Sequence, residues 1–91
     1  MLEQRVSLDL DKNIKTIEAR IIELTNRKIN LEREIDEFQA RYNLENDRLK
    51  KEVIRVQMSR VKRKLYECEK VLYLNQSLLS YDNRHEYQLE N

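Results

Sequence analysis

The segment Tyr42-Asn43-Leu44-Glu45-Asn46-Asp47-Arg48 holds the densest cluster of turn-forming residues in this chain. Asn tolerates the left-handed backbone conformation that ends many helices, so Asn43 is a candidate C-cap. Asn46 and Asp47 are candidates for the N-cap of a following helix, because their side chains accept hydrogen bonds from free backbone N–H groups. We therefore predict a turn at about residues 43–47 between two helices.

Upstream of this turn, apolar residues recur in alternating steps of three and four, which predicts a helix over about residues 8–43. Lys28 is the one polar residue that interrupts this stripe. Because the stripe keeps its phase over four heptads, we expect it to be buried against another helix. Its predicted core residues are Leu10, Ile14, Ile17, Ile21, Leu24, Leu31, Ile35, Phe38 and Tyr42.

Downstream, a second stripe with the same steps predicts a helix over about residues 47–81, followed by a polar tail at residues 82–91. This stripe is offset by two residues from the continuation of the first. Discontinuities within one coiled coil are usually three or four residues long, so the offset favours two separate helices. The predicted core residues are Ile54, Met58, Val61, Leu65, Cys68, Leu72 and Leu79, with Asn75 as the polar position.

The two predicted helices match in length, which is what an antiparallel hairpin needs in order to bury both stripes. We predict one all-α domain, an antiparallel two-helix coiled-coil hairpin that associates into a four-helix bundle. The alternative is one long helix of about 135 Å in a parallel coiled-coil dimer. Polar residues at stripe positions commonly set register or oligomeric state, and we expect Lys28 and Asn75 to have that role.

The composition supports long helices with a charged outer surface. The 91 residues include no Gly and no Pro, charged residues make up 38%, aromatic residues make up 7%, and the mean hydropathy is −0.89. Average usage would supply about 11 Gly and Pro residues. A β-sandwich, a Rossmann unit and a P-loop are excluded, because their turns and phosphate-binding loops need glycine. A chain this short buries little surface by itself, so we expect it to pack on another chain.

A second contact face is predicted on the second helix. Four apolar residues there lie off the main stripe, so the helix is apolar nearly all round, which is unusual for a helix buried on one side only. We expect a homo-oligomer, most simply a dimer, or docking on other helical proteins. The residues of this face are Val71, Leu74, Leu78 and Tyr81, and the first helix has a weaker version at Leu8, Ile22 and Ile29.

The basic residues are concentrated in one block. Residues 48–64 hold eight basic residues against Glu52 as the only acidic one, a net charge of +7, whereas the whole chain carries +1. In an antiparallel hairpin the facing segment, about residues 26–42, has no net charge, so an acidic partner or a nucleic acid is a candidate ligand. The basic residues are Arg48, Lys50, Lys51, Arg55, Arg60, Lys62, Arg63 and Lys64.

The basic block followed by leucines seven residues apart, Leu65, Leu72 and Leu79, resembles a basic-region leucine zipper. That resemblance implies a parallel helical dimer that reads DNA in the major groove. The position that would read a base holds Asp47, and an acidic residue is poorly suited to that contact. Ile54, which precedes Arg55, belongs to the apolar stripe. We therefore do not expect base readout.

No catalytic, cofactor-binding or metal-binding site is expected. Cys68 and His85 are single residues, and the sequence has neither a CxxC nor an HExxH motif. A lone cysteine leaves no internal disulfide, so we expect an intracellular protein, cytoplasmic or nuclear. No run of about 18 apolar residues is present, so no membrane partner is expected. The predicted function is that of a non-enzymatic scaffold, adaptor or assembly subunit, and the alternative is a nucleic-acid-binding helical module.

Overall fold

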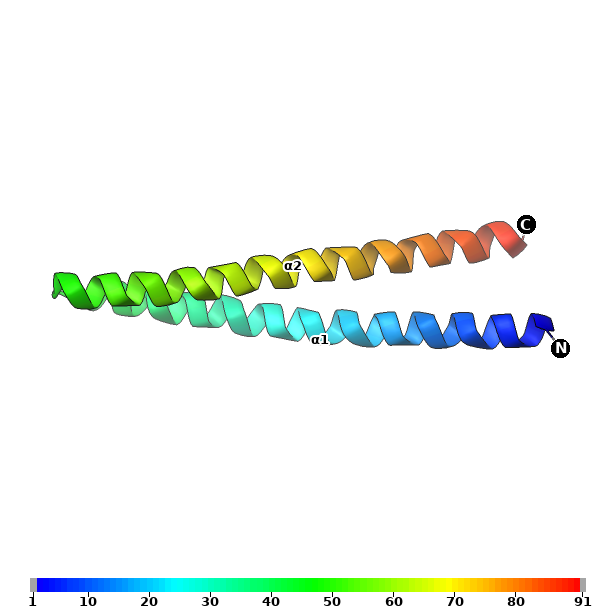
Figure 1. Ribbon diagram of the computed structural model, residues 1–91, viewed down its shortest axis with the longest axis horizontal. Coiled ribbons are helices and arrows are strands. Elements are labelled where there is room, and N and C mark those ends of the chain that lie inside the picture. The colour runs from blue at the N-terminus through cyan, green and yellow to red at the C-terminus, as the bar shows by residue number, and fades with distance from the viewer. Residues whose placement is uncertain (1, 91) are drawn as a thin grey trace.

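The protein is an antiparallel helical hairpin (Figure 1). The computed structural model describes the backbone of residues 2–90 and the side chains of residues 12–80. Helix α1 runs from Leu2 to Leu44 and helix α2 from Arg48 to Glu90, with 43 residues each. A helix of that length spans about 65 Å. The particle measures 69 × 19 × 14 Å, so the two helices overlap along nearly their whole length.

This architecture confirms the all-α hairpin and excludes the single continuous helix of the alternative prediction. The chain reverses after Leu44, and both ends of the chain lie at the same end of the molecule (Figure 1). The basic-zipper arrangement is wrong for the same reason. Leu65 and Leu72 pack against α1 of the same chain, whereas a basic-region zipper would pair them with a parallel copy.

Both helices extend beyond the predicted bounds. Helix α1 begins at Leu2 where the sequence indicated a start near residue 8, and α2 continues to Glu90 through the segment expected to be a polar tail. The physical reason is that neither segment contains Gly or Pro, the two residues that most strongly end a helix. The predicted core residue Leu10, and Leu8, Tyr81 and His85, lie outside the residues whose side chains are described.

Helix α1 ends without a left-handed residue. No described residue has a positive φ, so the expected left-handed C-cap at Asn43 does not form. Instead, the N–H of Glu45 donates to the carbonyl oxygen of Arg41 at 3.0 Å, which continues the helical pattern by one residue. The Asn43 side chain accepts a hydrogen bond from the amide of Gln39 at 3.0 Å.

Helix α2 begins with Asp47 as its N-cap. The Asp47 Oδ1 accepts a hydrogen bond from the N–H of Leu49 at 2.9 Å, and the Asp47 carbonyl oxygen accepts one from the N–H of Lys51 at 2.9 Å. The N–H of Asp47 itself donates to the Glu45 carboxylate at 3.2 Å. The connection of residues 45–47 therefore has a side-chain acceptor at each end, Glu45 and Asp47. These acceptors bind free backbone N–H groups, so the chain can reverse without glycine.

The core is a single layer between the two helices. Its centre is formed by Leu31 of α1 with Val61 and Cys68 of α2, and each of these side chains is less than 10% exposed. The sulfur of Cys68 lies 3.4 Å from the carbonyl oxygen of Leu24, which shows that residues equally far from Asn46 face each other. Among the described stripe residues, Met58 and Leu72 are also buried, and the others are half-buried: Ile14, Ile17, Ile21, Leu24, Ile35, Phe38, Tyr42, Ile54, Leu65 and Leu79.

Candidate interaction surfaces

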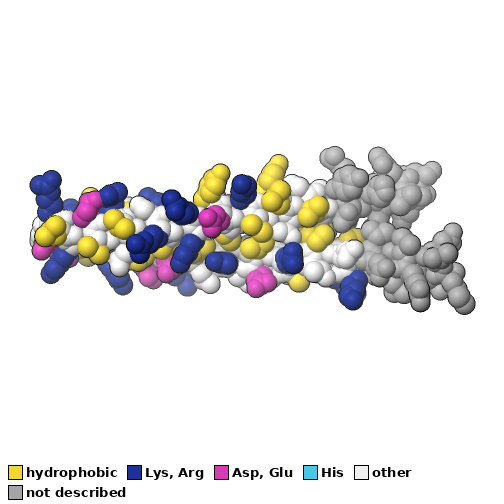
Figure 2. All heavy atoms as spheres, viewed as in Figure 1, with side chains coloured by type: hydrophobic (Ala, Val, Ile, Leu, Met, Phe, Trp, Pro, Cys, Tyr) yellow, Lys and Arg dark blue, Asp and Glu magenta, His cyan; other side chains and the backbone are white. Residues whose placement is uncertain are grey.

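Large apolar side chains on α2 lie outside the hairpin core. Val71 is 45% exposed, Leu74 53% and Leu78 52%, although all three lie beside core residues on the same helix. These are the described members of the predicted second face. Figure 2 shows hydrophobic side chains that protrude beyond the zone where the two helices meet. An exposed apolar group of this kind is typical of a surface that is covered by another chain.

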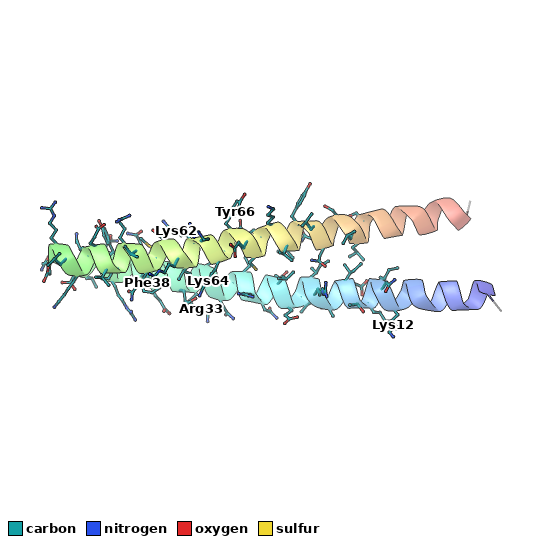
Figure 3. All side chains as sticks on the ribbon, viewed as in Figure 1. Lys12, Arg33, Phe38, Lys62, Lys64 and Tyr66 are labelled. Atoms are coloured by element: carbon teal, nitrogen blue, oxygen red, sulfur yellow. The ribbon has the colours of Figure 1, made fainter. Side chains whose placement is uncertain are left out.

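Two tyrosines add to the exposed apolar surface, and the sequence analysis missed them. Tyr66 and Tyr73 are exposed, and Tyr66 points away from α1 (Figure 3). Ile22 and Ile29 of α1 are also exposed. Ile22 and Ile29 were predicted as part of a weaker second face on the first helix. Tyr66 and Tyr73 are seven residues apart, and that spacing is the signal in the sequence that places them on one side of α2.

A further apolar group near the turn was also missed. Leu44, Leu49, Val53 and Val56 are exposed, and the last three lie along one side of the first turns of α2. The sequence signal is the spacing of four and then three residues, which is the spacing of a helical face. Leu49 and Val56 are the positions to which the first stripe projects. They face solvent because the second stripe, and not the continuation of the first, is the side of α2 that packs on α1.

The basic block is exposed along the first half of α2. Seven of its eight residues face solvent, and the eighth, Lys51, is half-buried with its Nζ 4.8 Å from the ring centroid of Tyr42. Figure 2 shows Lys and Arg side chains most densely around the half of the molecule next to the turn. Arg55 forms a short ion pair with Glu52, and its hydrogen bond lowers the pKa of the Glu52 carboxyl.

No ion pair joins the two helices within residues 12–80. The two pairs found there, Lys28 with Glu32 at 3.9 Å and Arg55 with Glu52, are each formed within one helix. Among the described residues, no carboxylate of α1 therefore forms an ion pair with the basic block. Its remaining solvent-facing residues are free to interact with an acidic ligand, namely Arg48, Lys50, Arg60, Lys62, Arg63 and Lys64.

The two polar stripe positions differ in how their side chains are satisfied. Lys28 is half-buried and extends toward Glu32 at the edge of the interface. Asn75 is 6% exposed and donates from Nδ2 to the carbonyl oxygen of Val71 at 2.8 Å. The Asn75 amide therefore forms its hydrogen bond within α2 and does not link α2 to α1.

Asn75 should lower the stability of the hairpin, and Asn75→Leu is expected to raise the melting temperature. An apolar side chain would gain contacts with α1 and lose only a local hydrogen bond. We expect a gain of about 1 kcal/mol, or about 5 °C for a domain of this size. Circular dichroism melting at a fixed protein concentration measures the change. Ser77→Leu, at an exposed position of the same helix, is the control, and a melting temperature of Asn75→Leu at or below the wild-type value would contradict the prediction.

Among residues 12–80, no three His, Cys, Asp or Glu side chains come together as a metal site. Cys68 is a free, buried thiol that donates weakly to the Leu24 carbonyl oxygen and packs as a small apolar residue. In the part of the chain that the structure describes, neither helix is both long and apolar enough to cross a bilayer.

Comparison with known protein families, curated proteins and solved structures finds no match to this chain. Any functional assignment therefore depends on the surfaces themselves. They consist of an apolar group on the outer side of α2, exposed tyrosines and isoleucines, and an uncompensated basic block.

Proposed function

We propose that this chain is a non-enzymatic helical interaction module, which packs the outer side of α2 on the helices of another polypeptide chain. The observation that carries the proposal is the exposure of Val71, Leu74 and Leu78 outside the hairpin core. Burial of apolar side chains is the main favourable term in protein association. Three such side chains on about two turns of one helix form a contact that another helix can cover.

The shape of the hairpin supports the same function. A two-helix layer can bury only the sides that face each other, so the outer sides of both helices are available to other chains. The molecule is 69 Å long and 14 to 19 Å in its other dimensions, which gives it a large outer surface for its mass. An elongated hairpin held by its own core therefore suits a structural or assembly role.

Size-exclusion chromatography with light scattering tests this proposal. We expect the mass to rise above the 11.2 kDa of one chain as the protein concentration increases. The double variant Leu74→Lys, Leu78→Lys should remain at the mass of one chain with unchanged helix content, because both side chains are solvent-exposed in the hairpin. Gln76→Lys, at an exposed polar position between them, is the matched control and should associate as the wild type does. A wild-type chain that stays monomeric up to millimolar concentration would contradict the proposal.

Binding of a nucleic acid is a second candidate function, and one specific observation favours it. The basic block of residues 48–64 carries a net charge of +7, and within residues 12–80 no carboxylate of α1 forms an ion pair with it. Exposed Lys and Arg side chains bind phosphates without sequence preference, by release of condensed counterions. Such binding would weaken steeply as the salt concentration rises.

A further inference from the structure

Helix α2 carries a second continuous strip of side chains beside its buried stripe. Several of its members are eleven residues apart, which corresponds to 3.67 residues per turn and gives a nearly straight line along a helix. All members of the strip are solvent-exposed. In chain order they are Leu49, Val53, Val56, Arg60, Lys64, Glu67, Val71, Leu74 and Leu78, and we call this set the outer strip.

The outer strip has a hollow in each half. The hollow nearer the turn has a volume of about 370 Å³ and is lined by the three apolar residues of that half together with Arg60. The hollow in the other half has a volume of about 280 Å³ and lies between the helices. It is lined from α1 by Leu24 and Arg27, and from α2 by Cys68 of the core together with Lys64, Glu67 and Val71. Each half of the strip therefore combines protruding apolar side chains with a recess beside them.

We propose that the outer strip binds the same strip of a second copy of this chain, with the two α2 helices antiparallel. The order of residue types is the same when the strip is followed from either end. Apolar residues occupy both ends, and charged residues occupy the middle. When residues whose numbers add to 127 are paired, Leu49 meets Leu78, Val53 meets Leu74, Val56 meets Val71 and Arg60 meets Glu67 of the second copy. The two-fold axis passes between residues 63 and 64.

Charge complementarity selects this arrangement. Antiparallel pairing brings Arg60 of each copy against Glu67 of the other, so two opposite-charge pairs form. Parallel pairing in register would place Arg60 against Arg60 and Glu67 against Glu67. An antiparallel register shifted by eleven residues would place charged side chains against apolar ones, which leaves charges without partners.

The middle of the strip also contains Lys64, which meets Arg63 of the second copy in this register, so like charges lie next to the two-fold axis. The long Lys stem can extend its charge past the contact into solvent. The strip from Leu49 to Leu78 is about 44 Å long, and pairing two copies would cover six apolar side chains from each.

This inference rests on the proposed interaction function and specifies its partner and geometry. The test measures the dissociation constant of the wild-type dimer by sedimentation equilibrium, and then that of Arg60→Glu, Glu67→Arg and the double charge swap. Each single reversal creates two like-charge pairs, so we expect dimerisation weaker by roughly 10- to 100-fold. The double swap restores both opposite-charge pairs and should recover most of the wild-type affinity.

Matched controls separate this pairing from general charge effects. Lys62→Glu and Glu69→Arg make the same charge changes at exposed positions two residues away and outside the outer strip, and neither should alter the dissociation constant by more than about twofold. If the dimer loses affinity in Leu74→Lys, Leu78→Lys but not in the single reversals, the interaction module stands and the antiparallel pairing is overturned. A wild-type chain that never dimerises would overturn both.

Discussion

Leu31→Asp is expected to unfold the hairpin. Leu31 is 6% exposed and contacts Val61 and Cys68 at the centre of the core. A carboxylate in that position would have no cationic partner within the core and would cost several kcal/mol. A core this small supplies a net stability of roughly 3–5 kcal/mol, so one such cost is enough to abolish it. We expect the helical circular dichroism signal at 222 nm to fall sharply at 25 °C.

Ile29→Asp is the matched control, because it introduces the same residue two positions away in the same helix. Ile29 is 48% exposed, so the carboxylate would remain hydrated, and the effect of aspartate on helix propensity is the same in both variants. Ile29→Asp should therefore keep its helical signal and melt within a few degrees of the wild type. Equal melting temperatures for the two variants would show that Leu31 is not in the core.

Reversal of three exposed basic residues, Arg48→Glu, Lys50→Glu and Lys62→Glu, should remove most of any affinity for nucleic acid. All three belong to the basic block, and none belongs to the outer strip, so dimerisation should be unaffected. If each side chain contacts one phosphate of duplex DNA, the slope of log K against log salt should become less negative by about 3. Fluorescence anisotropy with a labelled random-sequence duplex, at four salt concentrations, measures the slope.

The control for this experiment is a triple reversal in the other half of the hairpin, Lys12→Glu, Lys15→Glu and Arg20→Glu. These side chains are exposed, and the net charge of the protein changes by the same amount. Lys12 lies on α1 far from Lys62 along the hairpin (Figure 3). The control should retain salt-dependent binding. Equal losses in the two triple variants, or no binding by the wild type, would remove the basic block as a phosphate-binding site.

The heptad steps carried most of the information about the fold. They indicated which side of each helix is buried, and the two-residue offset between the stripes favoured two separate helices over one continuous helix. The two-residue offset means that the second stripe is not a continuation of the first along one helix. In the hairpin, each stripe instead faces the other helix. The same steps could not give the ends of the helices, since residues 2–7 and 82–90 form helix without belonging to a clear stripe.

The hydrogen bonds that form the turn were less predictable than the position of the turn in the sequence. A left-handed residue at Asn43 is the common way to end a helix, yet the chain uses Glu45 and Asp47 as side-chain and backbone acceptors. Sequence alone does not rank these solutions, because all of them use the same short polar residues.

The candidate surfaces also differ in how far they could be predicted from the sequence. The second face at residues 71–78 and the basic block were visible in the sequence, because each is a local run on one helix. The exposed Ile22 and Ile29 of α1 were also predicted, whereas the exposed pair Tyr66 and Tyr73 was noticed only when burial of the other sides was known. The outer strip needed the same knowledge, since Leu49 and Val56 could equally have belonged to the core of a continuous first stripe.

The order of residue types along the chain was sufficient for the helical class and the two buried stripes, and it favoured a reversal near residue 45. These are local properties, set by helical periodicity and by the absence of Gly and Pro. Which apolar residues remain exposed, and which charges lack a partner across the hairpin, was decided only by the packing of α1 on α2. Packing brings together residues far apart in the chain, and burial depends on those neighbours and not on residue type alone.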